Sequence, residues 1–335
     1  MNFDVVMPAT LFAVTVFAVL SSEKVERKLK AVFEDRTFRV RDAVLLVATI
    51  SVAVCLITMI PQMALMTIFL LAYSLLLFIF TYIFSDMEKV QAELFCLAFA
   101  IISFAAGTAS LYYSIFTDIH IAYGALALYG LCFSAFMALI YEEQRSHTRE
   151  RWYLAVLPSI LFVILYIFFS KTAIWFPYLL NLYGLVFAVL VILYFGSLFT
   201  WKTSVLFAGL LTVADVVLVL ITRSMVSAAT HVSSLRLPVL VVLPTFPQVG
   251  AIGLGLGDFF FAGLLAIQTY KKFGRNVAFL SSAAMAVSFF IFEALILSFG
   301  ISAFPGTLMI ACGWLLTVPI KFLRDKTEVS RDPPL

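Results

Sequence analysis

Three acidic residues, Asp215, Asp258 and Glu293, lie inside long apolar stretches of the chain. A charge near the middle of a bilayer costs at least about 2.5–3.5 kcal/mol, so acids at such positions are candidates for chemistry. At 1.5 Å rise per residue, Asp215 and Asp258 both lie roughly 10–14 Å below the same membrane surface. The helices that carry them are joined by one loop and are expected to be neighbours. The spacing therefore predicts two carboxyls that face each other.

Two carboxyls that face each other in a medium of low dielectric cannot both ionise easily, so they share a proton. The ionised carboxylate can take a proton from water, and the protonated acid can donate to a carbonyl oxygen. This pair of roles is the apparatus of aspartic proteolysis, which activates water without a covalent intermediate. The pattern predicts Asp215 and Asp258 as a catalytic pair.

Small residues accompany the second acid in the stretch "GLGLGDFFFAG". On a continuous helix, Gly255 and Ala262 would lie on the same face as Asp258. We expect Gly255 and Gly257 to give a partner helix, or a substrate backbone, close access to the acid. The alternative is that these glycines only allow helices to pack, as small residues commonly do in membranes.

The composition predicts an all-α polytopic protein of the cell membrane. The chain is 63% hydrophobic and 12% charged, whereas soluble domains are about 45–50% apolar and about 25% charged. The net charge of +3 gives no sign of a nucleic-acid partner. The cysteines lie in apolar runs and the histidines lie far apart, so we expect no disulfide framework, metal site or cofactor. These residues are Cys55, Cys96, Cys132 and Cys312, and His120, His147 and His231.

A bilayer core needs about 20 apolar residues per helix, and the sequence holds about eleven such stretches. Their expected limits are 3–20, 43–60, 64–84, 92–114, 121–141, 153–170, 176–199, 203–222, 249–270, 277–299 and 304–322. The first stretch ends without a signal-peptide cleavage site, so we expect a retained helix.

The positions of Lys and Arg test this count of spans. If successive loops alternate sides, all but three of the 22 Lys and Arg residues fall on one side; the exceptions are Lys171, Arg223 and Arg236. Cytoplasmic loops are enriched in Lys and Arg. We therefore expect the N-terminus outside, the C-terminus in the cytoplasm, and the loop 223–248 outside. An even number of miscounted helices would preserve this split, so nine spans are also compatible with it.

The stretch "GLGD", Gly255–Asp258, followed by "FFF", resembles the GxGD motif of presenilins and signal peptide peptidases. These are intramembrane aspartyl proteases. In this family the helix before the GxGD helix carries the first aspartate, usually in a Tyr-Asp pair. Here "LTVADVVLVL" supplies Asp215. The family also has a Pro-Ala-Leu motif at the start of its last helix, and here "SAFPGTLMI" occupies that place. The resemblance covers roughly residues 203–322 and is to an archaeal- or bacterial-type homologue.

The resemblance implies a presenilin-like catalytic bundle that cleaves transmembrane-helix peptides. It implies scaffold helices in 1–202, catalytic helices in 203–322 and a cytoplasmic tail in 323–335. The residues in the place of the Pro-Ala-Leu motif, Pro305, Gly306 and Thr307, are then candidates for substrate binding.

The chain departs from the family pattern at two places. Ala214 replaces the tyrosine, which bears on the geometry of Asp215. Gly306 and Thr307 replace Ala-Leu, which bears on substrate gating and inhibitor response. The family has nine spans. The outside position expected for the loop between the catalytic helices resembles signal peptide peptidases, so the implied substrates are type II helices such as remnant signal peptides.

A segment between the two aspartates reads as a strand. "LRLPVLVVLP", Leu235–Pro244, is rich in β-branched residues and bounded by prolines. A helical substrate must unwind before hydrolysis, and its freed backbone groups need partners. Our hypothesis is that this strand, just before the Asp258 helix, offers an edge to an unwound substrate. The residues concerned are Val239, Leu240, Val241 and Val242. The alternative is a re-entrant loop without a substrate role.

Other functions compete with an aspartyl protease. Prepilin peptidases also use a GxGD motif, but a basic residue normally follows it near the cytoplasmic side, whereas Phe259–Phe261 follow here. A proton-coupled transporter could use Asp215 and Asp258 as carriers, and a protease-dead homologue could only bind membrane helices. Glu293 is interpreted as a hydrogen-bonded packing residue, with a pocket acid as the alternative.

Overall fold

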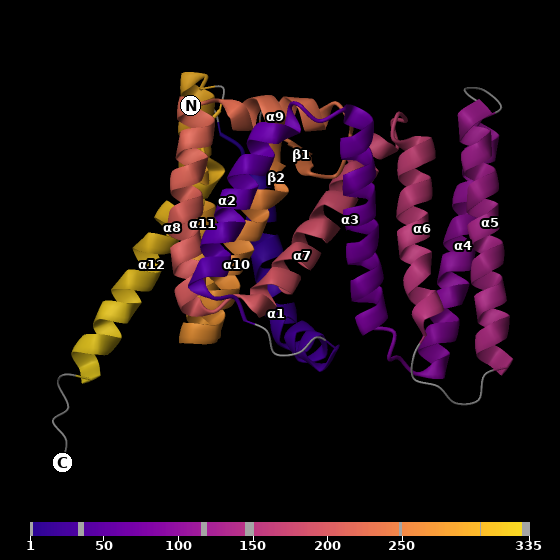
Figure 1. Cartoon of the computed structure of the whole chain (residues 1–335), viewed down its shortest axis with the longest axis horizontal. Coiled ribbons are helices and arrows are strands. Elements are labelled where there is room, and N and C mark those ends of the chain that lie inside the picture. The colour runs from indigo at the N-terminus through magenta and orange to yellow at the C-terminus, as the bar shows by residue number, and fades with distance from the viewer. Residues whose placement is uncertain are drawn as a thin grey trace, which may run out of the picture. The chain divides into compact units, whose positions relative to one another are not determined.

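The structure, a computed structural model, forms two compact units, which are described separately (Figure 1). Unit 1 comprises Met1–Ile60 with Asn181–Leu335, and unit 2 comprises Pro61–Leu180. The described residues are 3–32, 37–114, 119–144, 151–247, 250–301 and 303–329. The division into scaffold and catalytic helices is a functional one and stays a prediction.

Unit 2 is a group of long apolar helices with one short irregular turn. Its elements are α3 (Gln62–Ile83), α4 (Lys89–Ser114), α5 (Ile119–Gln144), α6 (Trp152–Phe169) and the wide turn η1 (Trp175–Leu179). Helix α5 packs against both α4 and α6, and α6 also packs against α3. The α5–α6 contact is close because Gly124 has no side chain; a Cβ there would lie 2.7 Å from the Cβ of Phe168.

Unit 1 holds the remaining helices and both strands. Its elements are α1 (Val6–Val32), α2 (Val40–Ile57), α7 (Leu180–Leu198), α8 (Trp201–Val216), the wide turn η2 (Val217–Ile221), α9 (Ser224–Ser233), β1 (Leu240–Pro244), β2 (Ala251–Gly255), α10 (Leu256–Phe273), α11 (Arg275–Phe299) and α12 (Gly306–Val329). Helix α7 enters unit 1 at its second residue, Asn181.

Helix α10 is the central helix of unit 1. Every residue from Phe259 to Thr269 is buried, and α1, α8, α11 and α12 all pack against it. Glycines bring α7 close as well, since a Cβ on Gly263 would lie 2.5 Å from the Ile192 side chain. Small residues permit this kind of close helix packing in membranes. Asp258 therefore begins the most enclosed helix of the unit.

Local sequence signals set several helix ends in unit 1. The Thr200 side chain accepts a hydrogen bond from the Thr203 N–H at the start of α8, as N-cap residues do. Helix α10 ends at Gly274 (φ 87°), and α11 ends at Gly300 (φ 65°). Both angles lie in the region that favours glycine. These turns fix where α10 and α11 begin and end.

The two strands form an antiparallel sheet in which Val241 lies opposite Leu254. The Leu256 N–H donates to the Val239 carbonyl (3.0 Å), which extends the same pattern by one pair. Because the backbone groups of alternate residues point away from the partner strand, the groups that β2 directs away from β1 belong to Ala251, Gly253 and Gly255. In Figure 1, α9 and the sheet lie near the upper end of the unit 1 helices.

The N-terminal segment joins this end of unit 1 through Asp4. Asp4 forms an isolated bridge with Pro247, and its carboxylate accepts from the N–H groups of Val6 (3.1 Å), Met7 (2.9 Å) and Phe246 (2.8 Å). One buried acid thus caps α1 and fixes the chain that follows β1.

The structure confirms an all-α polytopic membrane protein with a short strand before the Asp258 helix. Within the described residues, nine helices are long and apolar enough to cross a membrane. Their outward faces carry large apolar side chains such as Leu45, Leu126 and Phe133. The other two expected spans also form helices: α10 carries three charged residues, and the apolar part of α12, Gly306–Val318, is shorter.

One expected span is wrong at its start. The stretch 249–270 was expected to be helical throughout, but Ala251–Gly255 forms strand β2 and the helix starts at Leu256. The glycines at 253 and 255 lower helix propensity, and the preceding strand offers a pairing partner. Of the basic residues used for the orientation, Arg36, Arg145 and Arg149 lie outside the described residues, as do His147 and the expected tail beyond Val329.

Candidate functional site

Asp215 lies in the last turn of α8 and is 8% exposed. The backbone widens directly after it, because the Thr222 N–H donates to the Val217 carbonyl five residues earlier (2.9 Å). Single wide turns of this kind occur frequently at functional sites. The turn lies at the end of α8 from which the chain continues to α9 and the sheet.

Asp258 is the third residue of α10 and is half-buried. Its helix begins at Gly255, which has extended backbone angles (φ −68°, ψ 147°). The N-terminus of a helix carries a partial positive charge that favours a carboxylate. The expectation that Gly255 shares a helical face with Asp258 is wrong, because Gly255 is the last residue of β2. Gly257 lies in the first turn, and nothing lies within 4 Å of where its Cβ would be.

The first two residues of α12 contact one aspartate each. The Thr307 hydroxyl donates to Asp215 Oδ2 at 2.6 Å. A Cβ on Gly306 would lie 2.5 Å from Asp258 Oδ1, so only a glycine fits there without movement. Since consecutive Cα atoms are about 3.8 Å apart, both carboxyls lie beside the same turn of α12. They are close enough for their charges to interact.

Asp215, Asp258 and Gly306 line one cavity of about 480 Å³ in unit 1. All three acids singled out in the sequence, Asp215, Asp258 and Glu293, contribute to its wall. Most of the other lining residues are apolar and come from α9, the two strands, α11 and the start of α12. They include Val226, Leu240, Ile252, Phe289, Ile296 and Met309. The arrangement is a largely apolar pocket with a few converging carboxyls, which is typical of a binding or catalytic site.

The predicted strand edge is not free on β1. The side-chain amide of Asn181 donates to the Val242 carbonyl (2.5 Å) and its Oδ1 accepts from the Val242 N–H (2.8 Å). The Asn181 side chain thus pairs with both backbone groups of Val242 that point away from β2. Val241 is fully buried, with its side chain against α7 at Gly184. Of the four residues proposed on β1, Leu240 lines the cavity.

Strand β2 provides the edge that lies beside the acids. Ile252, Gly253, Leu254 and Gly255 all line the cavity. Within the described residues, no backbone hydrogen bond is formed by the outward N–H and C=O groups of Gly253. The strand edge with unpaired backbone groups beside the acids is therefore that of β2, whereas the sequence predicted one on β1; pairing of a substrate with either strand stays a prediction.

Two of the residues that organise the site were missed in the sequence. Asp4 lies at the start of the first apolar stretch and resembles an ordinary interface acid, although it caps α1. Asn181 lies in "LLNLYG" as an isolated amide in an apolar run. An uncharged polar residue in a membrane segment needs a hydrogen-bond partner, so Asn181 carried a usable signal. The identity of its partner, Val242, did not follow from the spacing.

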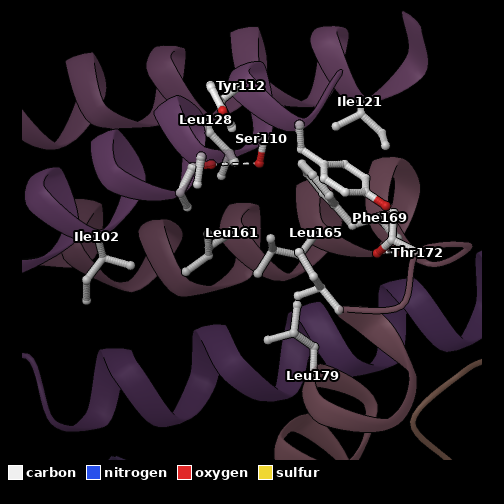
Figure 2. Close-up of a pocket in the computed structure, with 14 residues that line it drawn as sticks. Ile102, Ser110, Tyr112, Ile121, Leu128, Leu161, Leu165, Phe169, Thr172 and Leu179 are labelled. Carbon is white, nitrogen blue, oxygen red and sulfur yellow. Dashed lines mark hydrogen bonds between the residues drawn. The ribbon is translucent and has the colours of Figure 1, made fainter. Parts of the chain in front are cut away.

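Unit 2 contains a different kind of cavity, shown in Figure 2. It has a volume of about 580 Å³ and is lined mainly by aliphatic and aromatic side chains, including Ile102, Leu128, Leu161, Leu165 and Phe169. None of its lining residues is an acid or a base other than tyrosine. This pocket has no groups suited to acid–base chemistry, so the candidate site is the cavity of unit 1.

No protein-family model matches this chain, and a search of curated proteins finds no similar sequence. Within the described residues, no group of three or more His, Cys, Asp or Glu side chains is placed to hold a metal ion. The function is therefore argued from the geometry of the cavity together with the motif resemblance.

Proposed function

We propose that the protein is an intramembrane aspartyl endopeptidase of the presenilin and signal peptide peptidase type. The observation that carries the proposal is the placement of Asp215 and Asp258, from consecutive long helices, in the wall of one cavity. Both acids also contact the same turn of α12. Two interacting carboxyls in a largely apolar pocket are the arrangement that aspartic hydrolysis requires.

The proposed reaction uses one carboxylate as a general base and the other carboxyl as a general acid. The base removes a proton from a water molecule as its oxygen attacks the carbonyl carbon of the scissile peptide bond. The acid gives its proton to the carbonyl oxygen, which yields a tetrahedral diol. The diol collapses when the C–N bond breaks and the amine nitrogen takes up a proton. The products are a new carboxyl terminus and a new amino terminus.

The sheet supports a peptide as the substrate. An unwound substrate segment exposes backbone N–H and C=O groups that need partners inside the membrane. The outward groups of β2 lie in the wall of the cavity and continue directly into the Asp258 helix. Addition of the substrate as a strand beside Gly253 would satisfy its backbone and hold an amide near the acids. Glycine at 253 lets the Leu240 side chain pack closely against this strand, since a Cβ there would lie 2.8 Å from Leu240 Cδ2.

The proposed substrates are type II membrane helices, such as remnant signal peptides. This part of the proposal is supported by the distribution of Lys and Arg, which favours an outside N-terminus and a cytoplasmic C-terminus. Pro305 is buried behind the contact turn of α12. Thr307 donates to Asp215, so we assign it to positioning of the acid in place of substrate binding.

The proposal is tested with purified full-length protein in lipid nanodiscs and a synthetic type II helix peptide. Asp215→Asn and Asp258→Asn should each abolish cleavage, while thermal unfolding stays cooperative. Glu88→Gln, which changes an exposed glutamate of unit 2, is the matched control and should cleave normally. In H₂¹⁸O the new carboxyl terminus should gain the label, as shown by mass spectrometry. Full activity in either aspartate variant would contradict the proposal.

A proton-coupled transporter is the second candidate, because three carboxyls line one cavity. A transporter would take up protons into liposomes without cutting peptides, and its activity would depend on Asp215 and Asp258 as well. The strand edge beside the acids has no use in proton transport, so the cavity favours the protease. Proton flux without peptide cleavage would reverse this preference.

A further inference from the structure

Glu293 is a third acid in the cavity, and the hydrolytic reaction does not use it. It lies on α11 and is 5% exposed. Within the described residues, neither of its carboxylate oxygens has a hydrogen-bond partner. Buried polar atoms in native proteins are nearly always hydrogen-bonded, so an exception calls for an explanation. The interpretation of Glu293 as a hydrogen-bonded packing residue therefore finds no partner in the described structure.

A neighbouring acid shows what a structural carboxylate looks like in this part of the fold. Asp4 is close enough to Glu293 for their charges to interact and is 1% exposed. Its two oxygens accept three backbone N–H groups, those of Val6, Met7 and Phe246. Both oxygens of Asp4 therefore accept hydrogen bonds within the fold. The ionised carboxylate of Asp4 has no proton to donate to Glu293. The two carboxylate oxygens of Glu293 are therefore available to accept hydrogen bonds from a group that enters the cavity.

The charge of the cavity indicates what that group would be. Among the residues that the structure describes, its wall includes Asp215, Asp258 and Glu293, and no Lys, Arg or His. The described acids do not gather into a metal-binding group. A cation that brings its own hydrogen-bond donors fits this wall best, and ammonium and guanidinium groups both do so. The apolar side chains of Phe289, Ile296 and Leu297 can cover the methylene stem of such a side chain.

We propose that Glu293 is a specificity subsite that accepts a lysine or arginine side chain of the bound peptide. The inference rests on the proposed function, because it takes the ligand of the cavity to be a peptide segment. It adds a preference for one basic residue at a fixed distance from the bond that is cut. Loss of a hydrogen bond to a charged group reduces affinity by about 10- to 100-fold.

The test compares binding of two peptide series that differ at a single position. Each series carries lysine or norleucine, which has a similar length and no charge, at successive positions along one type II helix. Dissociation constants are measured by fluorescence anisotropy in nanodiscs, with full-length protein carrying Asp258→Asn to prevent turnover. At one position the lysine peptide should bind about 10- to 100-fold more tightly than the norleucine peptide.

Additional changes at position 293 decide whether that preference comes from the carboxylate. Glu293→Gln and Glu293→Met should each reduce the preference to within about twofold, whereas Glu88→Gln should retain it. An unchanged preference in both Glu293 variants, or no preference at any position in the parent, would overturn the subsite. Cleavage of the norleucine peptide by protein with Asp258 intact is measured separately. A lysine preference without cleavage would contradict the protease alone, and cleavage without a preference would contradict the subsite alone.

Discussion

Among the described residues two glutamates are buried, Glu142 in unit 2 and Glu293 in unit 1, and they have opposite surroundings. Glu142 is 2% exposed and accepts from the Arg151 Nε at 2.6 Å and from the Tyr153 hydroxyl. Arg151 also donates to the Met87 carbonyl. Glu293 is almost as buried, yet no described residue donates to either of its oxygens. Burial alone therefore does not distinguish these two acids; their hydrogen-bond partners do.

The cavities of the two units differ in the same way. The unit 2 pocket of Figure 2 is mainly apolar, and the buried Glu142 carboxylate lies outside it, paired with Arg151 and Tyr153. The cavity of unit 1 collects carboxyls and a strand edge in one place. Buried polar groups in membrane proteins are usually either paired with one another or part of a functional site. Unit 2 illustrates the first case, and we assign the second case to unit 1.

The largest expected effect on stability comes from breaking the paired acid. Arg151→Met leaves the Glu142 carboxylate buried with only the Tyr153 hydroxyl as its donor. Breaking a buried ion pair in this way costs about 3–5 kcal/mol. Thermal unfolding in detergent measures the change. The control is Lys89→Met, which removes a partly exposed 3.8 Å pair with Glu93 and should cost less than about 1 kcal/mol. Equal stabilities for the two variants would contradict the role of the pair.

The contact between α12 and Asp258 offers the sharpest test of the acid-lined cavity. A Cβ on Gly306 would lie 2.5 Å from Asp258 Oδ1 and 2.7 Å from its Cγ, so Gly306→Ala must displace the acid or the helix. A misplacement of about 1 Å can cost about 100-fold in rate. We expect a loss of this size in kcat for peptide cleavage. Gly130→Ala in α5 is the matched control, because nothing lies within 4 Å of its Cβ position. Retention of more than a third of the activity in Gly306→Ala would disprove this prediction.

Much of this site followed from the sequence because each carboxyl carries its own signal. Asp215, Asp258 and Glu293 stand out by their depth in apolar runs, and all three line one cavity. The strand before the Asp258 helix was also predicted, since proline and β-branched residues mark it. Its partner β2 was not predicted, because "AIGLG" is apolar and merges with the helix that follows.

The contacts made by the first residues of α12 could not be predicted from the sequence. The Thr307 hydroxyl, which the sequence predicted to contact a substrate, donates to Asp215, and the sequence did not indicate this contact. A single hydroxyl in an apolar segment can bond to its own helix or to a neighbour, and only the packing of α12 against α8 decides which. The neighbouring Gly306 is explained by a different contact, the close approach of α12 to Asp258 on α10. Sequence analysis located the acids, whereas tertiary contacts determine what holds them.

A smaller effect on kcat is expected at Thr307. It distinguishes the hydrogen bond that Thr307 donates to Asp215 from the packing of its side chain. Thr307→Val keeps the shape of the side chain and removes the donor to Asp215 Oδ2. Hydrogen bonds to charged groups contribute about 1.5–3 kcal/mol, so kcat should fall about tenfold or more. Thr307→Ser restores a hydroxyl and should recover most of the rate. Equal rates for the valine and serine variants would show that the hydrogen bond has no part in catalysis.

The smallest expected effect returns to the unpaired glutamate and has the opposite sign to that of a paired one. Glu293→Met removes two buried oxygens that have no donors and replaces them with a flexible apolar side chain. An unsatisfied buried polar group costs about 1–3 kcal/mol, so stability should be unchanged or should rise by about 1 kcal/mol. Glu142→Met, measured in parallel, should lower stability because it strands the Arg151 guanidinium. A clear loss of stability in Glu293→Met would mean that Glu293 supports the fold, and the contrast between the two acids would then fail.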